Sequence, residues 1–138
     1  MNKLVRFGVS LPGDLLKKFD KLIRERKYQN RSEALRDLIR KELIKKDLLT
    51  GKTATGAVLI VYDHHKRELV SKLIDIQHDY HDVIISSQHV HLDHHNCIEI
   101  IAVKGSVDKI KTFSNLLQSL KGVKQGELTL ATTGKNLS

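Results

Sequence analysis

The sequence predicts an α+β protein with two domains, at residues 1–50 and 54–133. Apolar residues alternate along 4–11, as in a strand, and then recur at helical spacing to about residue 48. After the polar stretch 50–53 the pattern changes to a β-α-β-β-α-β order. Positive charge is uneven too, because residues 1–50 hold 14 Lys and Arg against 7 Asp and Glu, whereas residues 51–138 hold 10 against 9. The chain therefore combines a strongly basic β-α-α domain with a nearly neutral second domain.

The first domain is predicted to be one strand followed by two helices. The odd-numbered residues of 5–11 are apolar and share one face of the strand. Pro12 suits the start of the first helix, where a residue needs no N–H partner. Asn30, followed three residues later by Glu33, has the form of a capping box, so we expect the second helix to begin after Asn30.

A domain with one strand leaves backbone N–H and C=O groups without partners. We expect a second copy of the chain to supply them, with the two strands antiparallel about a two-fold axis. The exposed face of this ribbon then carries Arg6, Gly8 and Ser10 from each copy, and such a ribbon fits the DNA major groove. The alternative is an edge strand that pairs with the second domain and leaves its basic face in solvent. The net +7 of residues 1–50 favours DNA binding.

The start of the second helix offers a further contact with DNA. Free N–H groups at Arg31 and Ser32 suit a phosphate, and Arg36 lies one turn further on. Residues 4–44 resemble a ribbon-helix-helix DNA-binding domain, which implies that strand positions 6, 8 and 10 face the bases. Gly8 departs from the usual pattern, in which a polar side chain is common, so base reading would rest on positions 6 and 10.

The second domain is predicted to have the split β-α-β order of ferredoxin-like domains. Its expected strands are 57–62, 83–92, 97–104 and about 127–131, and its expected helices are 66–80 and 107–120. Helical spacing predicts that the first of these helices turns four apolar residues inward: Leu69, Val70, Leu73 and Ile74.

Histidine and cysteine form the most specific pattern in the second domain. His89 and His91 would place both imidazoles on one face of a strand, roughly 6–7 Å apart. If residues 92–96 form the hairpin loop, His91 pairs with Cys97, and Glu99 lies opposite His89. If the loop is 93–96, Cys97 turns to the other face and the site fails, because a one-residue slip reverses the faces. Two imidazoles and a thiolate suit Ni(II), Cu(II), Co(II) or Zn(II), with a fourth ligand still needed.

The other histidines leave alternatives open. The position of His78 near a helix end suits a ligand and a surface residue equally. Four more histidines are better explained as solvent-exposed residues, although they leave further metal sites open: His64, His65, His94 and His95. The sequence also leaves open whether Lys66 and Arg67 touch DNA.

Over nearly its full length the chain resembles the nickel-responsive transcriptional regulators of the NikR family. The most specific stretches are Gln77-His78 and His89-Val90-His91-Leu92-Asp93-His94-His95-Asn96-Cys97-Ile98-Glu99. The resemblance implies a ribbon-helix-helix domain joined to a sensing domain of the ACT type, in a homotetramer that is a dimer of dimers. It implies one Ni(II) per subunit in square-planar geometry, with three ligands from one subunit and a fourth from its neighbour: His89, His91, Cys97 and the neighbour's His78.

The same resemblance implies further roles. Four residues would support the ligands through hydrogen bonds: Tyr62, His64, Gln77 and Glu99. Glu33 and Asp37 fall where family members can hold a second cation between the domains. We favour the alternative that these two acids, near the start of the helix, interact with its dipole.

These features predict a nickel-responsive, sequence-specific DNA-binding transcription regulator. By the resemblance, it would bind palindromic half-sites of double-stranded operator DNA and repress nickel uptake genes when Ni(II) is bound. The alternative is an ACT-domain regulator that senses another metal or an amino acid. A metalloenzyme is disfavoured, because a fourth protein ligand would close the coordination position that catalysis needs. A nickel store would leave the N-terminal ribbon unexplained.

Composition also predicts where the protein acts. The longest apolar run, residues 57–62, is far shorter than the roughly 20 residues of a membrane helix. We therefore expect no membrane partner. The N-terminus has no signal-peptide pattern, and a single cysteine suits a reducing compartment, so we expect the protein to be cytoplasmic.

Overall fold

The structure is a computed structural model, and it describes residues 3–49 and 52–135. The chain divides into two compact units at residues 42 and 43, inside a long helix. The polar stretch 50–53, which the sequence suggests as a short linker, lies partly outside the described residues, at Thr50 and Gly51, and partly in the second unit. The last turns of the helix belong to the second unit, because Leu48 packs against the core of that unit.

The first unit contains helix α1 (Gly13–Glu25) and most of helix α2 (Arg31–Leu49). Pro12 lies immediately before α1, and its carbonyl accepts a hydrogen bond from the Leu16 N–H at 3.1 Å. The Asn30 side chain accepts from the Glu33 N–H at 2.9 Å, which confirms Asn30 as the cap of α2. The Glu33 carboxylate accepts from the Gln29 N–H at 3.3 Å, one residue earlier than a capping box predicts.

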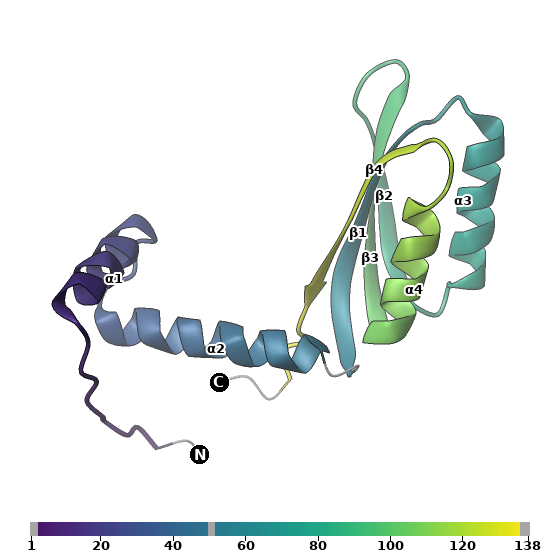
Figure 1. The fold of residues 1–138 in the computed structure, drawn as a ribbon. Helices are drawn as coiled ribbons and strands as arrows, with labels where there is room; N and C mark the ends of the chain where they lie inside the picture. The colour runs from purple at the N-terminus through teal and green to yellow at the C-terminus, as the bar shows by residue number, and fades with distance from the viewer. Residues whose placement is uncertain (1–2, 50–51, 136–138) are drawn as a thin grey trace. The chain divides into compact units, whose positions relative to one another are not determined.

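The N-terminal segment forms no strand in the single chain. Residues 3–12 lie in no helix or hydrogen-bonded strand and run as an extended segment into α1 (Figure 1). Phe7 is 69% exposed and Val9 is 60% exposed, although both were expected on the covered face. A strand without its partner has these properties, and pairing with a second copy stays a prediction.

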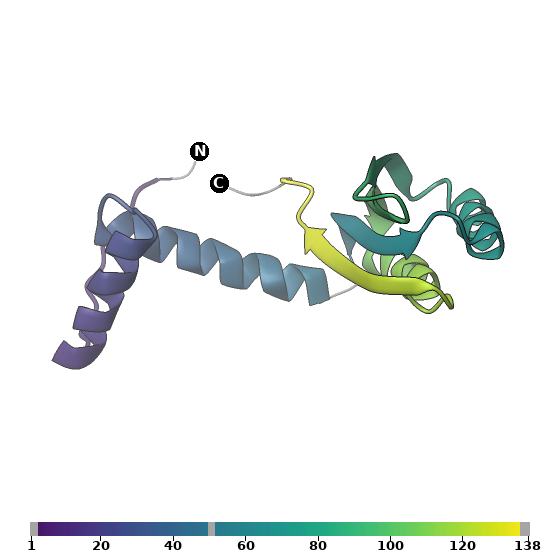
Figure 2. The same cartoon turned by 90° about the horizontal axis from the view of Figure 1, so that it is seen from above.

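The second unit confirms the β-α-β-β-α-β order. Its elements are β1 (Thr53–Asp63), α3 (Arg67–Asp79), β2 (Ile84–His91), β3 (Asn96–Ser106), α4 (Val107–Gln118) and β4 (Val123–Ala131). The four strands form an antiparallel sheet in the order β2-β3-β1-β4, and no strand from residues 3–49 joins it. Helices α3 and α4 cover one face of the sheet (Figure 1), with α4 lying along β1 and β4 (Figure 2).

The core of this unit lies between the sheet and the two helices. Ile60 of β1, Ile101 of β3 and Phe113 of α4 are fully buried there. The prediction that Ile74 points inward is wrong, because it is 61% exposed. The face of α3 that packs on the sheet instead includes the buried Leu73 and, one turn later, the half-buried Gln77. The Gln77 side chain there contacts Glu99 of β3.

The predicted first strand of this unit is too short. β1 runs from residue 53 rather than 57, because its ladder with β3 continues to the pair of Thr53 and Ser106. No helix among the described residues is long and apolar enough to span a bilayer.

Candidate metal centre and nucleic-acid interface

The pairing of β2 with β3 has the register that the metal hypothesis requires. His91 lies opposite Cys97, and His89 lies opposite Glu99. The Leu92 N–H donates to the Asn96 carbonyl at 2.9 Å and closes the hairpin beyond this pair. Directly opposed residues of a sheet point to the same face. The two imidazoles and the thiol therefore share one face.

A bulge at Ile85 sets this register. The ladder pairs Ile84 with Val103 and then Ser86 with Ala102, so one residue of β2 has no partner. If the register of Ile84 with Val103 continued along the strand without the bulge, His91 would lie opposite Asn96. The bulge therefore decides that His91 faces Cys97.

The shared face is the one that the helices cover. Cys97 and Glu99 are each 1% exposed, and Tyr62 of β1 lies opposite Cys97 on the other side of β3. His89 and His91 belong to the edge strand β2 and are exposed. The site thus combines a buried thiol and a buried carboxylate with two imidazoles that remain accessible.

Glu99 is the centre of a buried hydrogen-bond network. The Tyr62 hydroxyl donates to Glu99 Oε1 at 3.0 Å, and the Gln77 amide donates to Glu99 Oε2 at 2.8 Å. A ring nitrogen of His89, Nε2, lies 3.5 Å from Glu99 Oε1. Burial, and then the neighbouring Cys97 and Glu99, raise the pKa of Tyr62, which keeps its hydroxyl protonated as a donor. Both oxygens of the carboxylate therefore have donors, and the same network reaches His89.

Two further predicted residues lie at the margin of this network. The His64 ring lies 4.7 Å from the His91 ring, between centroids, and His64 Nε2 lies 3.1 Å from the His94 carbonyl. His78 is exposed in the last turn of α3, with its ring centroid 6.2 Å from that of His81. His78 is therefore accessible from solvent.

The predicted ligands His89, His91 and Cys97 share a face, but their donor atoms do not all lie within 4.8 Å of one another. Within 3–49 and 52–135, the group of metal-binding donors that lie within 4.8 Å of one another is Asp63, His65 and His95. The thiol and imidazoles of the predicted site nevertheless form a donor set that fits a borderline ion such as Ni(II). Sequence reasoning missed Asp63, whose only signal was its place directly before His64 and His65 at the end of a strand.

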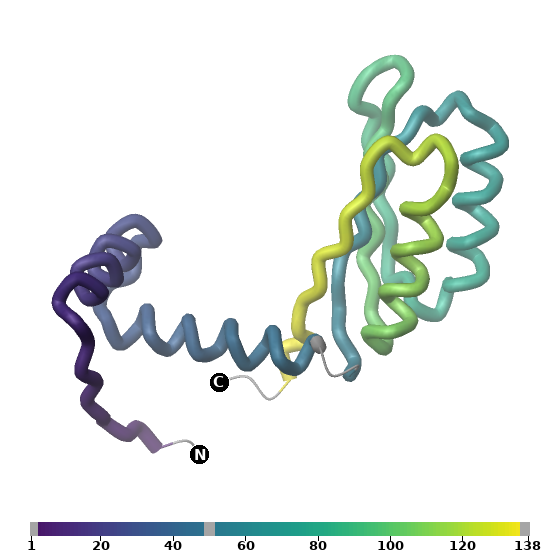
Figure 3. Tube along the Cα trace, viewed as in Figure 1, coloured from purple at the N-terminus to yellow at the C-terminus, as the bar shows by residue number. Residues whose placement is uncertain are grey.

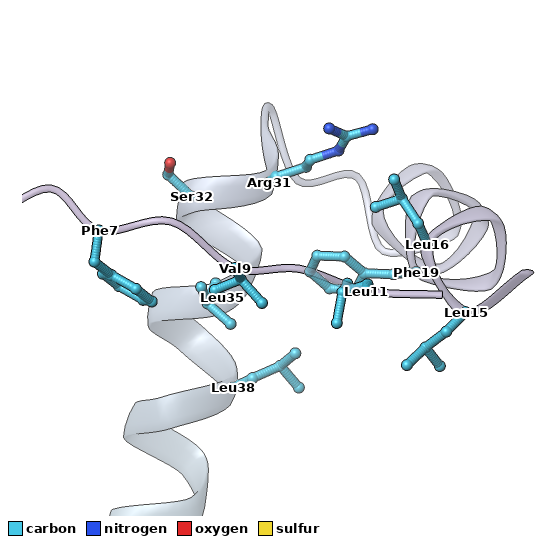
Figure 4. Close-up of a pocket in the computed structure, with 10 residues that line it drawn as sticks. All are labelled: Phe7, Val9, Leu11, Leu15, Leu16, Phe19, Arg31, Ser32, Leu35 and Leu38. Atoms are coloured by element: carbon cyan, nitrogen blue, oxygen red, sulfur yellow. The ribbon is translucent and has the colours of Figure 1, made fainter. Parts of the chain in front are cut away.

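The first unit has an apolar groove of about 500 Å³. It lies between the extended N-terminal segment and the two helices, and the side chains that line it converge from all three (Figure 4). The apolar lining residues are Phe7, Val9, Leu11, Leu15, Leu16, Phe19, Leu35 and Leu38. This exposed apolar surface is where a second copy was expected to pack.

The predicted DNA-contacting residues are all exposed: Arg6, Gly8, Ser10, Arg31, Ser32 and Arg36. The Arg31 guanidinium, however, is already bound. Its Nε and Nη2 donate to the two carboxylate oxygens of Asp20, each at 2.9 Å, and this pairing raises the pKa of Arg31. A phosphate at the start of α2 would therefore meet backbone N–H groups and a guanidinium that Asp20 holds in place.

The acids proposed for a second cation also have donors in the structure. Glu33 accepts from the Gln29 N–H, and Asp37 accepts from the Tyr28 hydroxyl and pairs with Lys41 at 3.0 Å. Tyr28 first, and then Lys41, hold the pKa of Asp37 below its ordinary value. A cation at this place would have to share Asp37 with the ammonium of Lys41.

Comparison with known proteins gives matches to both units. Residues 55–131 match the family described as the NikR C terminal nickel binding domain, and residues 5–46 match the ribbon-helix-helix protein, copG family. A protein of Syntrophus aciditrophicus is 55% identical over 135 residues, which is 98% of each chain. One of Chlorobaculum parvum is 56% identical over 131 residues, 95% of this chain and 98% of the relative. Both bear the name "Putative nickel-responsive regulator".

Among solved structures, an uncharacterized protein from Thermotoga maritima has a TM-score of 0.53. It is 15% identical and covers 57% of this chain and 98% of its own. At that identity the likeness concerns the fold alone.

Proposed function

Because the chain belongs to the NikR family of nickel-responsive regulators, we propose that it senses Ni(II) and couples nickel binding to recognition of operator DNA. The observation that carries this proposal is the strand register, which opposes His91 to Cys97 and His89 to Glu99. That register aligns the only cysteine of the chain with two histidines on one face.

We propose one nickel site per subunit, with His89, His91 and Cys97 from one subunit and His78 from a neighbour. Nickel bound there would link two subunits and so favour one quaternary arrangement. Glu99 Oε1 lies 3.5 Å from His89 Nε2 and would orient this ring, while the Tyr62 hydroxyl, which donates to Glu99 Oε1, would fix Glu99. The exposure of His78 in the single chain supports its assignment to a contact between subunits.

The DNA-binding form would be a dimer of the first unit, assembled twice in a homotetramer. Two copies of the segment 4–11 would pair and cover the apolar groove, and each copy adds a net +7 to the dimer. Arg6 and Ser10 would read bases in the major groove, while the start of α2 binds phosphate. Two such ribbons suit the half-sites of a palindromic operator, through which the protein would repress nickel uptake genes in the cytoplasm.

Metal and operator binding are then coupled. If nickel favours the quaternary arrangement that binds DNA, linkage requires operator DNA to strengthen nickel binding by the same factor. The coupling needs no contact between nickel and DNA, because both act on the arrangement of the subunits.

The first test replaces the thiolate. Cys97→Ser should remove the thiolate-to-nickel charge-transfer band and nickel-dependent binding to duplexes from nickel-transporter promoters together. His81→Ala, a change of an exposed histidine next to His78, serves as the control and should keep both signals. If Cys97→Ser still binds these duplexes in a nickel-dependent way, His89, His91 and Cys97 are not the sensor.

The second test asks whether the site is shared between subunits. His78→Ala and Cys97→Ser should each abolish nickel binding in a pure tetramer. In mixed tetramers, a subunit that keeps Cys97 meets a neighbour that keeps His78, so part of the charge-transfer band should return. If mixing restores no band, the fourth ligand does not come from His78 of a neighbouring subunit.

A further inference from the structure

A second group of metal-binding side chains lies outside the proposed nickel ligands. Asp63, His65 and His95 place donor atoms within 4.8 Å of one another. Asp63 ends β1 and His65 lies in the connection from β1 to α3, whereas His95 lies in the hairpin between β2 and β3. These two connections lie at the same end of the sheet (Figure 3). One subunit therefore supplies all three donors.

The backbone holds the two connections together. Asp63 pairs with Asn96 at the end of the β1–β3 ladder, and the His64 N–H donates to the His95 carbonyl at 3.2 Å. The Asp93 carboxylate accepts from the N–H groups of His95 and Asn96 at 2.9 and 2.8 Å. The donors thus come from segments that are already fixed to each other, which lowers the entropic cost of gathering them around an ion.

The carboxylate of Asp63 is ready to serve as a ligand. Its Oδ1 accepts from the His65 N–H at 2.9 Å and lies 3.3 Å from His65 Nδ1. The hydrogen bond from the His65 backbone, and then the two nearby imidazoles, hold the pKa of Asp63 below its ordinary value. A carboxylate has about four lone-pair sites, so these contacts leave capacity for an ion.

We propose that Asp63, His65 and His95 form a second divalent transition-metal site within one subunit. Two imidazoles and a carboxylate suit borderline ions such as Ni(II), Zn(II) and Cu(II), with water completing the coordination. Ligand atoms lie about 2.0–2.2 Å from such an ion, so small rotations of the exposed His65 and His95 rings bring the donors into range. Without a thiolate, this site binds more weakly than the site at Cys97.

The proposal is independent of the nickel sensor, because it uses none of that sensor's ligands. Its test measures bound Ni(II) by equilibrium dialysis in the full chain. Asp63→Asn and His95→Ala should each weaken the lower-affinity class of sites by about tenfold or more, and both should keep the thiolate charge-transfer band. His94→Ala, the neighbouring histidine of the same hairpin, is the matched control and should change this affinity less than twofold.

The same series in the Cys97→Ser background separates the two sites. There the remaining Ni(II) binding should still fall with His95→Ala and persist with His94→Ala. The proposal is overturned if Asp63→Asn and His95→Ala leave the weaker class unchanged, or if His94→Ala weakens it as much. Loss of the charge-transfer band in Asp63→Asn would also overturn it, because the group would then belong to the site at Cys97.

Discussion

Replacing Tyr62 by phenylalanine tests the network behind the proposed nickel ligands. The change removes the hydroxyl that donates to Glu99 Oε1 at 3.0 Å and lies 3.4 Å from His89 Nδ1, and it keeps the buried ring. Glu99 is 1% exposed, so water cannot replace the lost donor without rearrangement. Leaving a buried acceptor without its donor costs about 1–3 kcal/mol, and the protein without nickel should lose about that much stability.

Nickel binding should weaken for a related reason. Without the hydroxyl, Glu99 keeps the Gln77 amide as a donor but holds His89 less firmly. Loss of such supporting hydrogen bonds costs about 10–100-fold in metal affinity. Urea unfolding of the metal-free protein measures the first effect, and competition with a chelator measures the second.

Tyr28→Phe is the matched control for this experiment. It also removes a tyrosine hydroxyl that donates to a carboxylate, that of Asp37, but it lies in the first unit. It should leave nickel affinity within twofold of the wild-type value. If Tyr62→Phe changes nickel affinity no more than Tyr28→Phe does, Glu99 does not orient His89 and the reasoning is refuted.

Three further predictions follow from individual residues. Arg6→Ala should weaken specific operator binding by about 1–3 kcal/mol in a gel shift, and an equal loss on unrelated DNA would contradict a role in base reading. The Asp93 carboxyl, held by the side chain and N–H of Asn96, has a pKa of about 2. Because this pKa is lowered from 3.8, the stability that the carboxylate contributes is present above about pH 3.8 and is lost as the pH falls toward 2. An NMR titration with a midpoint near 3.8 would contradict this prediction. Gly122→Ala should destabilise the protein by about 1–3 kcal/mol in urea unfolding, because φ is +103° there and the added Cβ would lie 2.9 Å from Leu69 Cδ2; an unchanged midpoint would mean that the turn relaxes.

Local patterns predicted much of this fold. The order of elements in the second unit, the capping role of Asn30 and the end of α2 near residue 48 all follow from periodicity and side-chain chemistry within a few residues. The errors arose where packing decides. Ile74 fits the apolar helical spacing of α3 as well as Leu73 does, but the packing of α3 against the sheet buries Leu73 and leaves Ile74 exposed. The N-terminal segment forms no strand in the single chain, and the local alternation of residues 5–11 does not say which strand it pairs with; pairing with a second copy remains a prediction.

The amino-acid sequence established which donor types are present and that His89 and His91 can share a face. It could not determine whether Cys97 joins that face, because the sequence is compatible with a hairpin loop at 92–96 and with one at 93–96. Side chains alternate between the two faces of a strand, so a shift of one residue moves Cys97 to the other face. The bulge at Ile85 decides this register, and it depends on contacts along the whole hairpin. The meeting of Asp63 and His65 with His95 is likewise a property of the tertiary structure. The end of β1, at Asp63, and the start of β3, at Asn96, are 33 positions apart in the chain and become neighbours only when the sheet pairs them.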